Sequence, residues 1–218
     1  MFEYYYHEII RKTIVSFGTL FNQIKVQRKN TGENSISMIE VPLAYSSTQK
    51  FLARLRQQPD LNKPVQISLP RMSFEFTGIY YDAQRKVTTT QFFIAKDSNN
   101  NELKKSYMPV PYNVDFELSI YTITNDDMLQ IIEQILPYFQ PHFTLSIDLI
   151  QEIGEKRDIP ITLNSISMND DYEGDFSTRR SLIYTLTFTA KTYLFGPISN
   201  QDVSKDIIKK YKSFIVIK

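Results

Sequence analysis

The sequence of 218 residues has no cysteine, no tryptophan, two histidines and six glycines. Without cysteine it can form no disulfide, thiolate nucleophile or zinc-thiolate site, and nothing marks it as a secreted disulfide-rich protein. The glycines are never closer than fourteen positions. The dinucleotide-binding fingerprint and the phosphate-binding loop both need closely spaced glycines, so the sequence excludes both of these nucleotide-binding motifs.

Long apolar runs and net charge are also missing. The longest uncharged stretch, residues 134–147, is interrupted by two prolines, whereas a membrane-spanning helix needs about 20 apolar residues. Glu3, Glu8 and Arg11 near the start argue against a signal peptide. The 25 Lys and Arg residues balance 24 Asp and Glu residues, with a net charge of +1. This balance argues against a general affinity for nucleic acids, which needs a basic surface.

Apolar spacing predicts three helices. The first covers residues 6–21, where apolar residues recur at steps of three and four. A second, short helix begins at the capping residues Ser46 and Ser47 and ends before Pro59. A third follows Thr124, which is expected to cap it, and ends at Pro137. The expected inner faces of the first and third helices are Tyr6, Ile10, Ile14, Phe17 and Phe21, and Met128, Ile131, Ile132, Ile135 and Leu136.

Alternating apolar residues predict strands in most of the remaining chain. A hairpin is expected over residues 24–38, around a turn at 29–34. Residues 82–106 are read as an exposed hairpin or loop, because their pattern is weak. Further strands have the expected inner sets Met72/Phe74/Phe76/Tyr80, Phe116/Leu118/Ile120, Phe143/Leu145/Ile147, Ile159/Ile161/Leu163 and Leu182/Tyr184/Leu186/Phe188.

This order of elements predicts an α+β fold, a mainly antiparallel sheet with about three helices packed on it. We expect one domain over residues 1–200, with an exposed insertion near 82–106. Residues 201–218 should form a C-terminal strand or arm: five lysines flank apolar residues there, which suits either a protected edge strand or a segment that completes the sheet of another chain.

Few residues suggest chemistry. His7 and His142 have no second ligand or nucleophile at a suitable spacing. Asp126 and Asp127 are adjacent at a helix start, so they diverge by about 100° and suit capping rather than paired acid and base catalysis. The acidic loop at 169–174 resembles a calcium loop, but Arg180 falls where the anchoring Glu belongs. We therefore expect no catalytic residue, no metal and no cofactor.

Two short segments are candidate partner interfaces. In the segment from Pro137 to Pro141, two prolines fix an extended stretch, and its rings must either pack beneath it or face a partner. An arginine pair near a strand start is either solvated or in contact with a neighbour. The candidate interface residues are therefore Pro137, Tyr138, Phe139, Gln140, Pro141, Arg179 and Arg180.

Several sequence blocks resemble the tail sheath stabilizer and completion proteins of contractile-tailed bacteriophages. The longest block begins Phe-Glu-Leu-Ser-Ile-Tyr-Thr at 116–122 and continues through Asn-Asp-Asp-Met at 125–128 to Glu-Gln-Ile-Leu-Pro-Tyr-Phe-Gln-Pro-His-Phe at 133–143. Supporting blocks lie at 17–22, 41–46, 69–71, 156–159 and 174–180. The resemblance covers about residues 1–197.

The resemblance implies a structural virion protein, not an enzyme, with a fold like that of tail-terminator-type ring proteins. It implies a homo-hexameric ring at the head-proximal end of the tail, which caps the sheath and joins the tail to the neck. The implied partners are the tail sheath protein, the tail tube terminator and the neck (head completion) proteins, with no membrane and no specific nucleic acid. The implied location is the virion tail, after synthesis in the host cytoplasm.

The residues leave one alternative open. The 15 phenylalanines and 14 tyrosines, together with the C-terminal lysines, suit a module that binds nucleic acid or a small ligand, because rings on strands stack on unpaired bases.

Overall fold

A computed structural model describes residues 4–29, 36–50, 53, 69–88, 90–96, 103–171 and 181–198. Its centre is a six-stranded sheet in the order β3-β4-β7-β10-β9-β8. Every neighbouring pair in this sheet is antiparallel except β3 with β4. The strands are β3 (Leu43–Tyr45), β4 (Arg71–Tyr81), β7 (Val110–Thr122), β8 (His142–Ile150), β9 (Glu155–Asp171) and β10 (Ser181–Leu194). The predicted mainly antiparallel α+β fold is confirmed.

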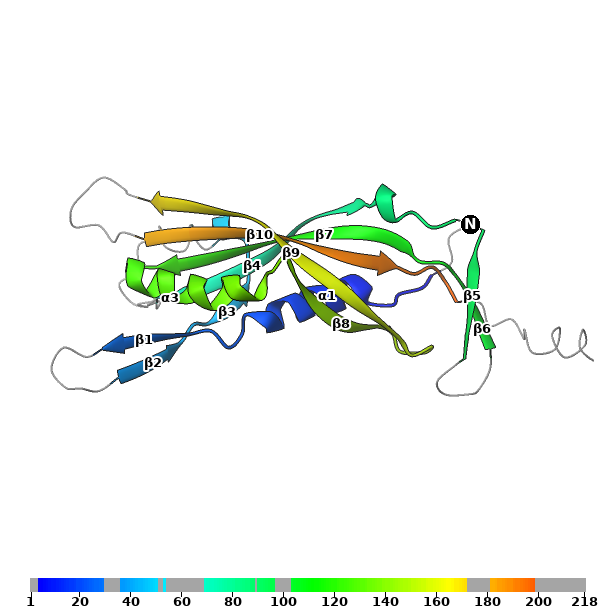
Figure 1. The fold of residues 1–218 in the computed structure, drawn as a ribbon, viewed down its shortest axis with the longest axis horizontal. Coiled ribbons are helices and arrows are strands. Elements are labelled where there is room, and N and C mark those ends of the chain that lie inside the picture. The colour runs from blue at the N-terminus through cyan, green and yellow to red at the C-terminus, as the bar shows by residue number, and fades with distance from the viewer. Residues whose placement is uncertain are drawn as a thin grey trace, which may run out of the picture.

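Helices cover one face of this sheet, and two hairpins lie at opposite ends of the molecule (Figure 1). One hairpin pairs β1 (Lys25–Lys29) with β2 (Ile36–Glu40), as predicted, and the other pairs β5 (Phe92–Lys96) with β6 (Leu103–Tyr107). The helices described over their full length are α1 (Ile9–Leu20) and α3 (Asn125–Ile135), with the short 3-10 helices η1 (Ala83–Arg85) and η2 (Leu136–Tyr138).

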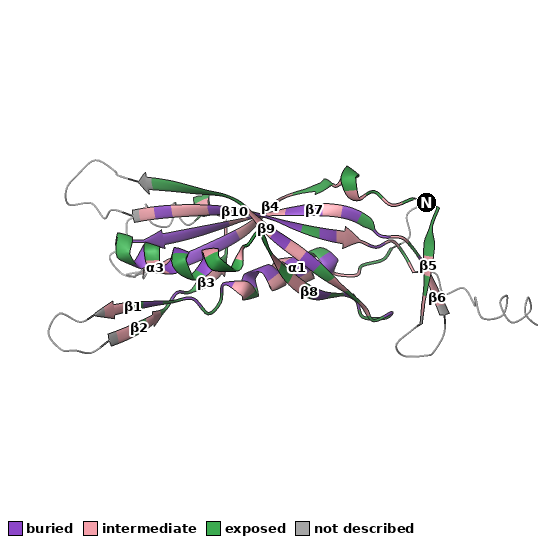
Figure 2. Ribbon diagram, in the orientation of Figure 1, coloured by how far each residue is buried: buried purple, intermediate pink, exposed green. Residues whose placement is uncertain are grey.

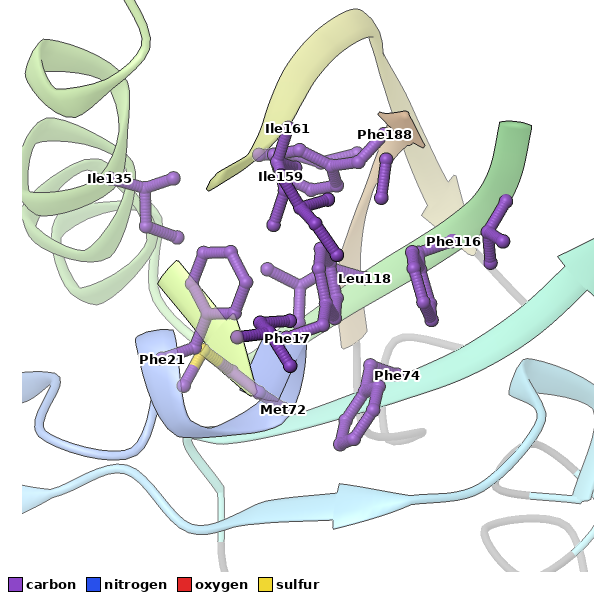
Figure 3. Packing of buried hydrophobic residues seen from close by; sticks show 14 of the residues in the cluster. Phe17, Phe21, Met72, Phe74, Phe116, Leu118, Ile135, Ile159, Ile161 and Phe188 are labelled. Carbon is purple, nitrogen blue, oxygen red and sulfur yellow. The ribbon is translucent and has the colours of Figure 1, made fainter. Parts of the chain in front are cut away.

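The core lies between the helices and the sheet, and rings from several elements meet there (Figure 3). Phe17 of α1 stacks on Phe116 of β7, with ring centroids 4.3 Å apart and planes 8° from parallel. Its ring also contacts Phe74 of β4 and Phe188 of β10. Figure 2 shows the burial concentrated along the central strands and the inner sides of the helices.

The inner face predicted for α1 is partly wrong. The helix begins at Ile9, and its buried residues are Ile9, Thr13, Phe17 and Gly18, while Tyr6 and Ile10 are exposed. The reason lies at Gly18, where an added Cβ would be 2.7 Å from Cζ of Phe74. The bare helix backbone accepts this ring, so α1 turns its Gly18 side toward the sheet.

The inner set predicted for β4 is wrong at its end. Met72 and Phe74 are buried, but Tyr80 is 46% exposed. The register with β7 shifts between Phe76 and Gly78, which is a β-bulge, and one extra residue moves the following side chains to the opposite face.

Several predictions fall outside the described residues: most of the second helix, the turn at 30–35, the loop at 172–180 and residues 201–218. The division into a domain at 1–200 and a C-terminal arm stays a prediction.

Candidate interaction site

Helix α3 starts as the sequence predicts. The side chain of Thr124 accepts a hydrogen bond from the Asp127 amide, and Asp126 and Asp127 lie in the first turn, where the helix dipole favours negative charge. After Ile135 the chain passes into η2, which contains Pro137.

Asp127 has a second role that the sequence does not reveal. Its side chain is only 3% exposed and binds Arg28 of β1 through both carboxylate oxygens, at 3.3 Å from Nε and 2.5 Å from a terminal guanidinium nitrogen. This hydrogen bonding raises the pKa of Arg28 above its ordinary value, against a smaller opposing effect of burial. The two-point contact ties β1 to the start of α3.

Two glutamines one helical turn apart extend this attachment along β1. Gln130 accepts from the Gln27 amide at 2.9 Å and donates to the Gln27 carbonyl at 3.1 Å. Gln134 makes the same pair of bonds with Lys25, at 3.3 and 2.8 Å. Because alternate residues of a strand face the same edge, the two side-chain amides act as a neighbouring strand would. We call Gln130 and Gln134 the glutamine clamp.

The predicted interface at 137–141 contains one inner and one outer ring. Phe139 packs against the core, with ring centroids 5.1 Å from Phe188, 6.3 Å from Phe143 and 6.5 Å from Phe21. Tyr138 is 66% exposed. The sequence allowed a ring in this segment either to pack inward or to face a partner. In the structure Phe139 packs inward and Tyr138 faces outward.

Tyr138 stands at the rim of a groove of about 470 Å³ between the end of α1 and the end of α3. The groove is mostly apolar, and Glu133 and Gln134 add polar atoms to its wall. Its apolar walls include Leu20, Phe21, Ile24, Pro137 and Phe143. An apolar side chain from a partner would fit this shape.

Exposed rings also gather at the end of the molecule that carries the β5–β6 hairpin, which the sequence interpretation did not identify. The imidazole of His7 donates from Nε2 to the Gly196 carbonyl at 3.0 Å, and Phe93 of β5 packs against Phe195. The N-terminal tyrosines and the β5–β6 hairpin therefore meet at the end of β10. The aromatic end comprises Tyr4, Tyr5, Tyr6, Tyr80, Tyr81, Phe92 and Tyr107, all 43% exposed or more. The runs of adjacent tyrosines at 4–6 and 80–81 are the signal that was available in the sequence.

Hydrogen bonds and a cation–π contact of Arg85 stabilise the aromatic end. Arg85 donates to Asp82 at 2.7 Å and to the side chain of Asn113 at 2.8 Å, and its guanidinium lies 5.0 Å from the ring centroid of Tyr193. The hydrogen bond from Arg85, with a smaller contribution from the Gln84 amide, lowers the pKa of Asp82. These contacts hold η1 against the ends of β7 and β10.

The two adjacent aspartates at the start of α3, Asp126 and Asp127, make structural contacts. His142 is exposed at the start of β8. Glu117 accepts from Thr48 at 3.0 Å, and Asp126 accepts from Gln130 at 3.1 Å. Within the described ranges, no group of three or more His, Asp or Glu side chains is arranged to hold a metal ion, and no helix there is long and apolar enough to span a membrane.

The remaining candidates lie outside the described residues. They are Arg179 and Arg180, and the C-terminal lysines on which the nucleic-acid alternative depends. Both ideas stay predictions.

Comparison with known proteins shows the family to which the chain belongs. The family described as T4-like virus Myoviridae tail sheath stabiliser matches residues 4–216. Tail completion protein gp15 of Enterobacteria phage T4 is 33% identical over 210 residues, which cover 93% of this chain and 76% of that protein. The chain therefore belongs to the tail sheath stabiliser family of T4-like viruses and is a structural component of the virion tail.

Proposed function

We propose that six copies of this chain form a closed ring at the head-proximal end of a contractile tail. The ring caps the last disc of the sheath and joins the tail to the neck, with a fold of the tail-terminator type. Its neighbours are the sheath protein, the tube terminator and the neck proteins, and its role is mechanical, without a reactive site.

The observation that carries this proposal is the pair of different exposed apolar surfaces at separate places along one sheet. The aromatic end lies at one end of the sheet, and the groove with Tyr138 lies nearer its middle, beside the C-terminal end of α3. A ring is built from head-to-tail contacts, in which one surface of a subunit binds a different surface of the next. Exposed aromatic side chains are typical of residues that dominate such interfaces.

The surfaces also suit contact with more than one partner. Tyr138 at the groove is the candidate anchor of the segment 137–141, since Phe139 is engaged in the core. Arg179 and Arg180 stay candidate contacts to a neighbouring subunit or to the sheath.

Native mass spectrometry and negative-stain electron microscopy test this proposal. The purified chain, alone and mixed with sheath and neck proteins, should give a particle of six copies with sixfold symmetry. A chain that stays monomeric with every tail component, or phage particles whose sheath and neck attach normally without it, would contradict the proposal.

A further inference from the structure

Among the described residues, half of strand β9 has no neighbour on one side. β8 pairs with β9 only from Glu155 to Thr162. Beyond that point, residues 163–171 pair with β10 alone among the described residues. In Figure 1 this half of β9 runs along the margin of the sheet, away from β8. Alternate backbone N–H and C=O groups therefore face outward along this edge.

This open edge is neutral and exposed. Residues 163–169 read Leu-Asn-Ser-Ile-Ser-Met-Asn, without a charge or a proline, and 164–169 are all exposed. Ile166 and Met168 lie opposite Leu186 and Tyr184 of β10, so they continue an apolar row to the edge of the sheet. An added strand would extend this row by one more side chain at each position.

Several other free edges are protected. The β8 edge carries Asp148 and a bulge beside it, and Lys12 donates to the Leu149 carbonyl at 3.1 Å. The glutamine clamp occupies the edge of β1, β3 has three residues, and β6 carries Lys104 and Lys105. Natural proteins use such charges, bulges and short strands to prevent strand addition. Apart from a bulge at Asn164, where its register with β10 shifts, the neutral edge of β9 lacks these devices, as expected if a partner strand covers it.

We propose that residues 212–218 of a second copy of this chain add to the open edge of β9 as a further strand. The inference rests on the proposed ring, because the added strand would join neighbouring subunits. The segment reads Lys-Ser-Phe-Ile-Val-Ile-Lys, with β-branched and aromatic residues favoured in strands. Added in register with β9, Phe214 and Val216, or Ile215 and Ile217, would extend the row of Ile166 and Met168.

Charge supports this choice of occupant. Five lysines lie between positions 205 and 218, whereas the open edge is neutral and β9 ends in two aspartates, Asp170 and Asp171. A lysine-flanked apolar strand is therefore complementary to an edge whose only charges are negative.

Chain length favours a second copy over the same chain. The middle of the open edge, Ser167, lies opposite Thr185, nine residues before the end of β10, which is about 30 Å at the rise of a strand. Residues 195–211 could span about 56 Å when fully extended. A flexible linker of seventeen residues has a root-mean-square extension of about 23 Å, so a return to the edge of its own chain would stretch it beyond its typical length. In a ring, the placement of the neighbouring subunit sets the distance instead.

Cysteine cross-linking tests the proposal, and the cysteine-free chain provides a clean background. One isotope-labelled preparation carries Ile215→Cys, and unlabelled preparations carry Ser165→Cys, Ile166→Cys, Ser167→Cys or Met168→Cys. Thr144→Cys, an exposed position on the protected β8 edge, is the matched control. Directly opposed residues of paired strands are close enough for a disulfide. After the two preparations are mixed, assembled and oxidised by copper phenanthroline, mass spectrometry counts the labelled-to-unlabelled disulfides.

We expect one or two of the edge positions to cross-link at least about tenfold more than Thr144→Cys, with neighbouring positions alternating as the strand period requires. A parallel variant, Ser167→Lys, should raise the concentration needed for assembly at least tenfold, while Thr144→Lys should not.

A further variant carries both Ile215→Cys and Met168→Cys. Three results would overturn the inference: equal cross-linking at all positions in an intact six-copy ring, disulfides only within one chain in the double variant, or a cross-link from the edge to a sheath or neck protein. In these cases the proposed six-copy ring is still supported if the assembled particle has the mass of six copies. If no ring forms with any tail component, the proposed function and this inference both fail.

Discussion

Tyr138 and Phe139 are adjacent residues with opposite environments. The Phe139 ring packs among Phe21, Phe143 and Phe188, whereas two thirds of Tyr138 is open to solvent. An aromatic side chain in a packed cluster stabilises the monomer. An exposed aromatic side chain beside an apolar groove can instead stabilise the contact with a partner.

Separate alanine substitutions should distinguish these roles. Phe139→Ala should lower the free energy of unfolding by about 2–4 kcal/mol, because it leaves a cavity in the partly buried cluster. Tyr138→Ala should change it by less than about 0.5 kcal/mol and should instead weaken ring or tail assembly. Urea unfolding of the monomer and an assembly assay measure the two effects. The assignment is wrong if Phe139→Ala leaves stability unchanged.

The ion pair of Asp127 and Arg28 supports a prediction of its own. Asp127→Ala should destabilise the monomer by about 1–3 kcal/mol, because it removes a charged hydrogen-bond acceptor that is almost fully buried. The expected cost is at the lower end because Arg28 is 41% exposed and regains water. Asp126→Ala, at the exposed neighbouring position, is the matched control and should cost less. Equal costs of the two substitutions would show that the helix dipole, rather than the ion pair, explains both aspartates.

At the scale of elements, the glutamine clamp fixes the direction of the β1–β2 hairpin. Replacing both Gln130 and Gln134 by leucine removes four hydrogen bonds to β1, each worth about 0.5–1.5 kcal/mol at most in exposed positions. Hydrogen exchange at the Lys25 and Gln27 amides should then become at least about tenfold faster, while exchange in β7 stays unchanged. Glu133→Leu, on the same helix but outside the clamp, should leave β1 protected. Unchanged exchange in the double variant would mean that β2 alone holds β1.

The elements differ in how far sequence patterns could predict them. Helix α3 and its Thr124 cap were predictable because the cap and the apolar spacing are local. The face of α1 was not, because it depends on the fit of the Phe74 ring against Gly18, and the end of β4 depends on a bulge set by its pairing with β7.

The interaction site was less predictable for the same reason. The segment 137–141 could be noticed from its prolines, but which of its rings faces inward depends on Phe188 and Phe21, far away in the sequence. The glutamine clamp joins residues 103 and 109 positions apart, and such contacts leave no local pattern.

At the scale of the whole molecule, one long sheet connects two different exposed surfaces. The core along its inner face makes the sheet a firm connection between the aromatic end and the groove beside α3. A continuous sheet with one packed face suits a structural tail protein that has more than one neighbour.

Cryo-electron microscopy of the assembled tail tests the central claim most directly. We predict one ring of six copies at the head-proximal end of the tail, in contact with the last sheath disc, with the aromatic end or the Tyr138 groove buried between subunits. A map that places the chain elsewhere in the tail, or that shows both surfaces open to solvent in the assembled ring, would contradict this account.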